Sequence, residues 1–514
     1  MFAVFLLNII LIIMKRASGH QSEAPQPRQK FPDLEFSLES DPFNSLFTQA
    51  KNLLGKKQTF QVSPYPEVLL QDTAFALSPF TPAKRFQVPS SPFLCLLSNY
   101  IDTLCIDISN TQSSSTSVLT HILTHVYKHK SQIQQNDSKS PETKDQAFTP
   151  ATVLLIVPTL SGAKDVIDFL IRSHCKEKIK RVSKLSRKKY DEVFPEDFDR
   201  NADAVKFGIS LADRELNLIS PFKKADIILG TPLSIRQGLE KGENLDSGIL
   251  ASVQICAVFD CQGLLMQNWD HVEDLFANMN LIPDRDSVTV DLNRIRDEYM
   301  DGNGKRFRQL IVQTEFVTPL IMALFNKNEN FRGKARVVQH FACPILRCIQ
   351  KFRKFNLSGT AEISLKRFQY FTSLWSKLQE ETLPTSLIFI SSYYEFVRLK
   401  SWLEENDPGV LCISEYTSKP DRQRNLSLWK NGTNKVICIT ERLLYYRPLK
   451  FAELGTTIFY ELPEFKEHYI TLSSKCQESV SLFCKFDGFA LQRIVGDAKA
   501  NKMLGSCSEI FSIN

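Results

Sequence analysis

The sequence predicts an α/β protein with two parallel-sheet domains, preceded by a proline-rich N-terminal arm. From about residue 150, short apolar runs without strict alternation are separated by segments whose apolar residues recur at helical spacing. A strand that is buried on both faces is apolar throughout, so such runs predict parallel strands. The chain has 514 residues, 43% hydrophobic and 23% charged, which is enough for the cores of two large domains.

Residues 1–90 read as an apolar run at 2–14 followed by the arm. The run is close to signal-peptide length, but its positive charges, Lys15 and Arg16, come after it. About 13 apolar residues are too few to span a bilayer, so we expect no membrane partner. A secretory signal stays open as the minor alternative. The proline density at 20–90 argues against regular secondary structure.

The first domain is expected at 91–340. A loose segment at 110–117 leads into a helical pattern from Ser117, and the predicted strands lie at 152–157, 226–229, 254–258 and 309–313. The second domain is expected at 341–514, with strands at 386–390, 410–413, 435–439, 456–460 and 479–483. Amphipathic helices separate the strands in both halves. The hinge is expected between Arg332 and Thr382, where the strand rhythm lapses.

Charge and cysteine content restrict the class of partner only weakly. The net charge of +6 is modest for this length, so attraction to a polyanion has to come from local clusters. The twelve cysteines include no close CxxC pair and no zinc-binding spacing, which predicts free thiols in a reducing compartment and no metal site.

The chain lacks the phosphate-binding loop GxxxxGK[ST]. The nearest residues, 54–57 (LGKK), lie in the arm without a preceding strand, and the Ser/Thr run at 113–117 contains neither glycine nor lysine. Phosphoryl transfer depends almost entirely on positioning and charge neutralisation, which this loop supplies. We therefore expect no ATPase activity, no cofactor and no small-molecule substrate.

The loops after the predicted strands nevertheless follow a recognisable order. In parallel sheets the ligand edge is formed by loops at the carboxyl ends of the strands. Along the first domain these loops present Pro158, Thr159, Thr231, Pro232, Asp260, Gln262 and Thr314. The order resembles the helicase layout of a Pro-Thr, a Thr-Pro, an acidic strand end and a Ser-Ala-Thr-like turn. Only one carboxylate, Asp260, stands where a pair would bind magnesium.

Seven short sequence stretches carry a more specific resemblance to a known family. They lie at 145–159, 225–236, 264–272, 412–418, 439–447, 459–465 and 491–503, and among them QNW (267–269) and TER (440–442) are the most specific. In these words the chain resembles the digestive-organ expansion factor family, also called the U3 small nucleolar RNA-associated protein 25 family, over about four fifths of its length. The resemblance implies two RecA-like domains descended from a DEAD-box helicase without a working phosphate loop.

The resemblance further implies a function in the nucleolus. It points to a non-catalytic scaffold of the small-subunit processome that assists early pre-ribosomal RNA cleavages toward 18S rRNA. The implied partners are pre-ribosomal RNA and processome proteins that contain U3 snoRNA. The sequence departs from the family at 259–262, where an Asp-Gln-Ala-Asp-like word is replaced by Phe-Asp-Cys-Gln, so that neither acidic position keeps its carboxylate.

Three basic clusters are candidate RNA contacts, either as phosphate-neutralising surfaces or as ordinary solvated segments. The densest consists of Lys176, Lys178, Lys180, Arg181, Lys184, Arg187, Lys188 and Lys189. The second is Lys305, Arg306 and Arg308. The third, with Lys351 and Arg353, alternates cations with rings as a stacking platform would, and its alternative is an amphipathic linker helix.

In the second half, Glu441 and Arg442 follow a predicted strand. Because no phosphate loop stands opposite them, we interpret them as an interdomain ion pair that fixes the two domains. Trp269 is expected to pack in the core. Two further hypotheses remain open: an ATP-dependent RNA helicase with an unrecognised nucleotide site, and a secreted or membrane-associated protein directed by residues 2–14.

Overall fold

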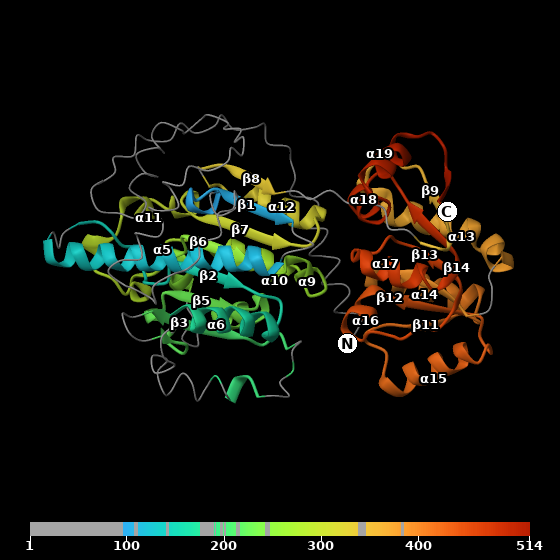
Figure 1. Cartoon of the computed structure of the whole chain (residues 1–514), viewed down its shortest axis with the longest axis horizontal. Helices are drawn as coiled ribbons and strands as arrows, with labels where there is room; N and C mark the ends of the chain where they lie inside the picture. Colours follow the sequence, from blue (N-terminus) through green and yellow to red (C-terminus); the bar gives the residue numbers. More distant parts are fainter. Residues whose placement is uncertain are drawn as a thin grey trace, which may run out of the picture.

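The computed structural model describes residues 96–106, 111–139, 143–174, 190, 192–195, 199, 202–211, 216–241, 247–330, 332–337, 346–381 and 385–513. The apolar run at 2–14, the arm at 20–90 and the basic cluster at 176–189 lie outside these residues. The described residues form two α/β bodies, each built on one sheet (Figure 1).

The first sheet has eight strands in the order β4-β3-β5-β2-β6-β7-β1-β8. It is parallel except at β3, which runs antiparallel to β5 and β4. The strands are β1 (Asp102–Ile106), β2 (Val153–Ile156), β3 (Lys206–Leu211), β4 (Leu216–Asn217), β5 (Ile227–Gly230), β6 (Ile255–Val258), β7 (Gln309–Thr314) and β8 (Lys334–Val337).

The second sheet has seven strands in the order β11-β12-β10-β13-β14-β9-β15, with only β15 antiparallel to its neighbour. The strands are β9 (Ile349–Lys354), β10 (Ser386–Ile390), β11 (Leu411–Ile413), β12 (Val436–Thr440), β13 (Leu454–Phe459), β14 (Cys476–Phe483) and β15 (Ile510–Ile513). The chain passes from the first sheet to the second between β8 and β9.

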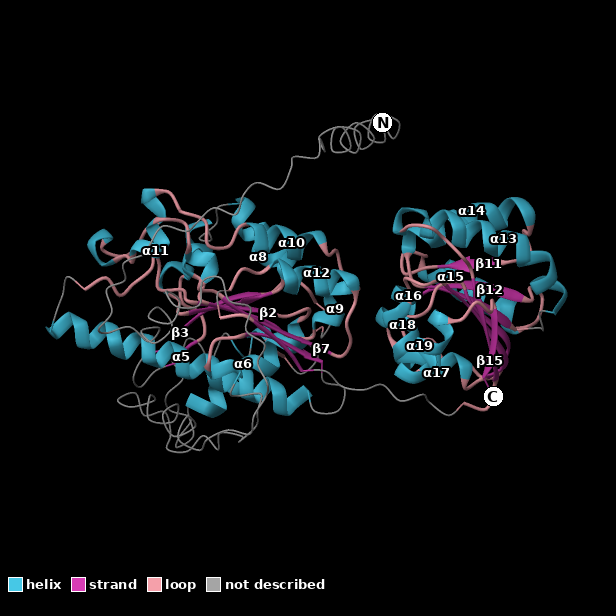
Figure 2. Ribbon diagram, turned by 90° about the horizontal axis from the view of Figure 1, so that it is seen from above, coloured by secondary structure: helices cyan, strands magenta, loops and turns pink. Residues whose placement is uncertain are grey.

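Helices cover both faces of each sheet, as strands that are apolar on both faces require (Figure 2). On the first sheet, α5 (Thr111–Lys139) and α6 (Leu160–His174) pack on one face. The other face is covered by α8 (Pro232–Lys241), α9 (Cys261–Leu265), α10 (Asp270–Ala277) and α12 (Pro319–Lys327), while the short α11 (Asp297–Met300) lies with Phe148 and Ile295 in a separate small cluster.

On the second sheet, α13 (Ile363–Glu381) and α14 (Tyr393–Asn406) cover one face. The opposite face packs against α15 (Lys419–Lys430), α16 (Glu441–Tyr446), α17 (Lys466–Ser473), α18 (Gly488–Val495) and α19 (Asp497–Gly505). The predicted fold class of two parallel-sheet α/β domains is confirmed. All nine predicted strands are present, and Trp269 packs in the core beneath the first sheet.

The strand that begins the first domain, β1, was not predicted from the sequence. β1 starts with a buried carboxylate, Asp102, which accepts hydrogen bonds from the Leu310 amide at 2.8 Å and from the side chains of Asn328 and Asn330 at 2.7 and 2.8 Å. Burial raises the pKa of Asp102 to about 6. The segment at 110–117 was predicted to be loose, but α5 begins at Thr111 directly after β1.

For the cluster around Lys351, the alternative of an amphipathic linker helix is wrong. Residues 349–354 form a strand, not a linker helix, and the side chains alternate between the two faces of the sheet. Phe352 is fully buried, and Lys351 forms an ion pair with Glu478 at 2.6 Å. The ring in this cluster is therefore core packing and offers no stacking platform to RNA, with Arg353 half-buried on the same strand.

Candidate functional site

The carboxyl ends of the first sheet's strands carry the helicase-like loops, and their polar groups bond to one another. The Pro158 carbonyl accepts a hydrogen bond from the Gln267 side chain at 2.6 Å, and the Thr159 hydroxyl accepts one from the Gly162 amide at 3.4 Å. The Thr231 hydroxyl donates to the Asp203 carbonyl and accepts from the Ser234 amide at the start of α8. Pro232 occupies the first turn of that helix, where a missing N–H costs nothing.

The loops after β6 and β7 are tied together in the same way. Asp260 has a left-handed backbone, with φ 46° and ψ 48°, and precedes α9. The Gln262 side chain is buried and accepts a hydrogen bond from the Glu315 amide at 3.2 Å. The Thr314 hydroxyl donates to the Phe316 carbonyl at 2.7 Å.

The charge at this edge is negative. Partial burial and the neighbouring Asp165 carboxylate raise the pKa of Asp260, although its side chain reaches solvent. Burial and the carboxylates of Glu467 and Asp260 raise the pKa of Glu315. Carboxylates that raise one another's pKa form a site that repels further anions.

β1 lies beside β7, so its carboxyl end belongs to the same edge of the sheet. Near the start of α5, the Ser115 hydroxyl donates a hydrogen bond to the Gln313 side chain on β7 at 2.9 Å. A strand is followed in the chain by a helix here, as it is around a phosphate loop. Because the strand was missed in the sequence, this equivalence was missed with it.

Glu441 and Arg442 do not form the predicted interdomain ion pair, because both bond within the second domain. The Glu441 carboxylate is fully buried and accepts hydrogen bonds from the Glu464 and Phe465 amides at 3.0 Å each and contacts the His468 ring nitrogen at 3.0 Å. Arg442 pairs with Glu415 at 3.4 Å.

Other residues join the two domains. The Tyr446 hydroxyl donates to the Met266 carbonyl at 2.9 Å. Arg493 donates to the Val317 carbonyl at 2.9 Å, and its guanidinium lies 4.4 Å from the centre of the Phe316 ring. Phe316 also meets Phe465 edge to face at 5.1 Å.

A glycine lies where the two domains meet. A Cβ atom on Gly263 in α9 would lie 3.1 Å from Pro158 Cγ and 3.2 Å from the Tyr445 hydroxyl oxygen. Since contacts of 3.0 to 3.4 Å are tighter than most Cβ contacts, a larger residue here would require Pro158 and Tyr445 to move by a few tenths of an ångström. The carboxyl edges of the two sheets therefore meet through direct protein contacts.

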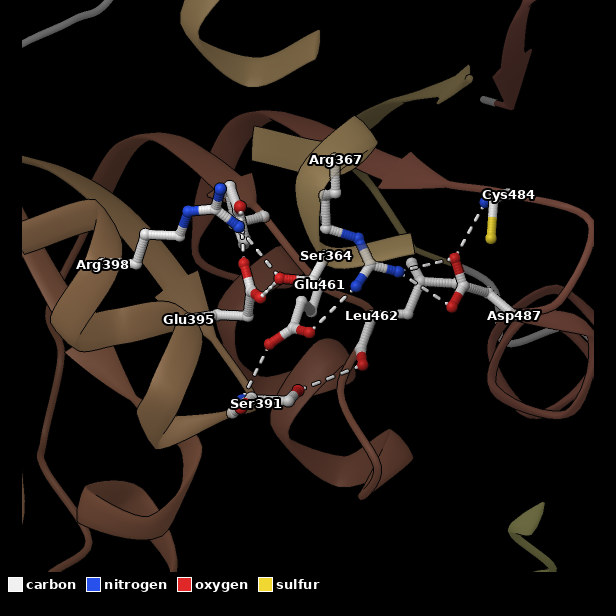
Figure 3. Close-up of polar contacts among 11 residues, drawn as sticks. Ser364, Arg367, Ser391, Glu395, Arg398, Glu461, Leu462, Cys484 and Asp487 are labelled. Carbon is white, nitrogen blue, oxygen red and sulfur yellow. Dashed lines mark hydrogen bonds and ion pairs between the residues drawn. The ribbon is translucent and has the colours of Figure 1, made fainter. Parts of the chain in front are cut away.

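A buried ionic network fixes the loop after β10 (Figure 3). Arg367 on α13 bonds to Glu461 at 2.9 Å and to both oxygens of Asp487 at 2.9 Å. The other Glu461 oxygen accepts the Ser392 amide at 2.7 Å, and the Ser391 hydroxyl donates to the Leu462 carbonyl at 3.1 Å. Burial raises the pKa of Glu461 to about 7.

Of the second basic cluster, only part remains accessible. Arg308 is buried and donates to the Asn280 side chain at 2.9 Å and to Asn328 at 2.7 Å, a structural role that does not fit the predicted RNA contact. Lys305 is exposed and pairs with Glu329 at 2.9 Å, and Arg306 is half-buried.

Membrane-spanning helices and metal-binding groups are absent from the described ranges. No helix there is long and apolar enough to cross a membrane. No three His, Cys, Asp or Glu side chains in those ranges are grouped so that they could hold a metal ion. The nine cysteines in the described part are free thiols.

The fold and this edge define a tandem α/β protein whose two sheets meet at their carboxyl ends, the layout of NTP-hydrolase-like proteins. Two family models match the chain: "UTP25, NTP hydrolase-like domain" at residues 100–335 and "Utp25, C-terminal domain" at 343–513. The chain belongs to the UTP25 family.

Curated relatives from fungi support this assignment. The chain is similar to the U3 small nucleolar RNA-associated protein 25 of Chaetomium globosum, with 30% identity over 72% of this chain and 57% of the relative. The protein of the same name from Podospora anserina is 29% identical over 82% of this chain and 71% of the relative. For several of these relatives the chain spans less than two thirds of their length.

Solved structures of DEAD-box proteins are similar at a lower level. The yeast splicing factor Prp28 matches with 13% identity and a TM-score of 0.30, over 86% of this chain and 94% of that one. S. cerevisiae Dbp5 bound to RNA and ADP BeF3 matches with 14% identity and a TM-score of 0.29, over 87% of this chain and 93% of that one. Similarity at this level adds nothing to the sheets described above.

Proposed function

We propose that this chain is a non-catalytic, helicase-like scaffold of the nucleolar small-subunit processome, acting in pre-ribosomal RNA processing toward 18S rRNA. The name of its relatives, U3 small nucleolar RNA-associated protein 25, supports a place among U3 snoRNA-containing particles. Its partners are then pre-ribosomal RNA and processome proteins, and its location is the nucleus and within it the nucleolus.

The observation that carries the non-catalytic part is the sequence between β1 and α5. In a phosphate loop this segment supplies glycines whose backbone N–H groups surround the phosphates, and a lysine that neutralises them. Residues 107–115 read DISNTQSSS, with no glycine and no lysine. The Ser115 hydroxyl, moreover, bonds to Gln313.

The rest of the edge does not fit magnesium or a triphosphate either. The residues beside Asp260 are Phe259, Cys261 and Gln262, none of which supplies a second carboxylate. The Asp165 carboxylate raises the pKa of Asp260, and the Asp260 carboxylate raises the pKa of Glu315. Negative charge at these side chains disfavours the binding of a further anion. The Arg493 and Tyr446 contacts join the domains directly, a task that a bound nucleotide performs in an active helicase.

The first test measures nucleotide binding and turnover. Purified full-length protein is titrated with a fluorescent ATP analogue and magnesium, and phosphate release is followed with and without single-stranded RNA. We expect no saturable binding and no release above buffer. Saturable, magnesium-dependent binding with RNA-stimulated release would establish the alternative, an ATP-dependent helicase with an unrecognised site.

The second test addresses the particle. Crosslinking of the tagged protein in cells, followed by RNA sequencing, is expected to enrich pre-ribosomal RNA and U3 snoRNA, and imaging is expected to place the protein in nucleoli. A variant without residues 1–20 is imaged beside it. Enrichment of other RNAs, or full-length protein in secretory compartments, would overturn the proposal.

A further inference from the structure

Three loops after neighbouring strands bring rings and a cation to one edge of the second sheet. The sheet order places β11, β12 and β10 side by side, and all three are parallel. Their carboxyl ends lead directly to Tyr416, to Arg442 and to the pair Tyr393 and Tyr394. Residues 22 to 49 positions apart in the sequence therefore meet on one surface, which we call the tyrosine edge.

The rings of the tyrosine edge are unusually exposed. Tyr394 is 87% exposed and Tyr416 is 63% exposed, the two largest exposed fractions among the large apolar and aromatic side chains of the described residues. Tyr393 meets Tyr416 edge to face at 4.8 Å, and the Arg442 guanidinium lies 5.9 Å from the centre of the Tyr416 ring. Large rings that face water instead of the core are typical of binding surfaces.

These exposed rings stand on a rigid frame. The Ser392 amide, just before Tyr393, is held by Glu461, which is fixed in turn by Arg367 (Figure 3). The Glu415 carboxylate, just before Tyr416, accepts the Thr440 hydroxyl at 2.7 Å and pairs with Arg442. A surface whose loops are fixed before binding loses little conformational entropy when it binds.

The surface also continues toward the first domain. Arg442 interacts with Tyr446, whose hydroxyl bonds to the Met266 carbonyl beyond the domain junction. The cation of Arg442 thus lies between the exposed rings and the first domain. Rings spaced along a path with a cation beside them match single-stranded nucleic acid, whose bases stack on aromatic side chains while arginine meets the backbone.

We propose that Tyr394, Tyr416 and Arg442 form a stacking site for single-stranded RNA. The site rests on the proposed function, because it gives the scaffold a defined place to hold an unpaired stretch of pre-ribosomal RNA. Every base has a π-face, so the site binds single strands with little regard to sequence and does not accept a double helix.

The test measures the affinity of the full-length chain for a labelled oligouridylate about 10 nucleotides long by fluorescence anisotropy. Base stacking on a ring contributes enough that each of Tyr394→Leu and Tyr416→Leu is expected to weaken binding roughly five- to tenfold, and the double variant more. Tyr394→Trp keeps a stacking face and is expected to retain the affinity. Because no charge is removed, the dependence on salt concentration stays unchanged.

The matched control is Phe486→Leu. Phe486 is also exposed, at 39%, and has the Lys485 cation 5.0 Å from its ring centre, but it follows β14, which β13 separates from β10 in the sheet. We expect its affinity to equal that of the parent. Thermal unfolding of each variant checks that the exposed substitutions leave the fold intact.

The outcomes separate this inference from the proposed function. Unchanged affinity in the double variant, or a parent chain that does not bind the oligonucleotide, overturns the stacking site even where pre-ribosomal RNA is still recovered from cells. If the double variant no longer recovers processome proteins but keeps its affinity for RNA, the tyrosine edge is a protein contact. This result also overturns the stacking site. Ultraviolet crosslinking gives an independent result: uridine adducts on the peptides with Tyr394 or Tyr416 support the site, and adducts confined to 176–189 contradict it.

Discussion

Arg493→Met tests whether direct contacts hold the two domains together. Arg493 is buried in α18 and donates to the Val317 carbonyl of the first domain while its guanidinium lies over Phe316. A hydrogen bond from a charged donor contributes about 1.5 to 3 kcal/mol, and a cation over a ring about 0.5 to 2 kcal/mol. Methionine keeps most of the volume but removes both interactions, and it also removes the 2.6 Å ion pair of Arg493 with Glu464 within the second domain.

The expected loss for domain closure is therefore about 2 to 5 kcal/mol, or roughly 30- to 4000-fold in the equilibrium between closed and open forms. Small-angle X-ray scattering measures this directly, because separated domains increase the radius of gyration. We expect a larger radius for Arg493→Met than for the parent, with no nucleotide present in either sample.

The control separates closure from stability. Arg367→Met removes a buried arginine of the same kind, whose partners Glu461 and Asp487 lie in the second domain only. It is expected to lower the melting temperature of that domain, since breaking a buried ion pair costs about 3 to 5 kcal/mol, and to leave the scattering curve of the native protein unchanged. An unchanged radius in Arg493→Met would refute the reasoning.

Three further predictions concern the same structure. Gly263→Ala is expected to weaken closure in scattering because its Cβ would press on Pro158 and Tyr445, whereas Gly359→Ala, with no atom within 4 Å, should match the parent. Glu441→Gln is expected to lower the free energy of unfolding of the second domain by about 1 to 3 kcal/mol in urea titrations, because a charged acceptor of two backbone amides is lost. Burial lowers the pKa of His121 to about 4. As the pH falls from 6.5 to about 4, the unfolded state therefore takes up a proton at this histidine while the folded state does not. The free energy of unfolding decreases as the pH is lowered through this window. The stability of the parent relative to His121→Phe should therefore drop by about 2 kcal/mol between pH 7.5 and pH 5, and a constant difference would contradict this.

Much of the fold follows from the sequence because the buried strands are apolar without a break. Apart from Gly230 and Ser386 at their ends, β2, β5 and β10 consist of Val, Leu, Ile and Phe and are buried along their whole length. β1 was not predicted because its first residue, Asp102, carries a carboxylate whose hydrogen-bond partners are more than 200 positions away in the sequence. β9 escaped because its alternating Lys, Phe and Arg residues suggested RNA contacts and not a strand with one buried face.

The contacts of the candidate site were harder to predict from the sequence than the fold, since they depend on how the two domains meet. The order of the loops was visible, but nothing in the word Thr440-Glu441-Arg442 indicates that Glu441 bonds to amides 23 and 24 positions later. Arg493 carried no signal, because a single arginine in an amphipathic helix is normally on the surface. The exposure of Tyr394 could not be read either, since Tyr393 beside it is partly buried.

The placement of β1 and β9 has a consequence for how the chain folds as it leaves the ribosome. β1 is synthesised first, yet its two neighbours, β7 and β8, emerge more than 200 residues later. β9 likewise pairs with β14 and with β15 at 510–513. Neither sheet can therefore be completed until its last strand has been made, and in the meantime the early strands present unpaired edges that chaperones have to protect from aggregation.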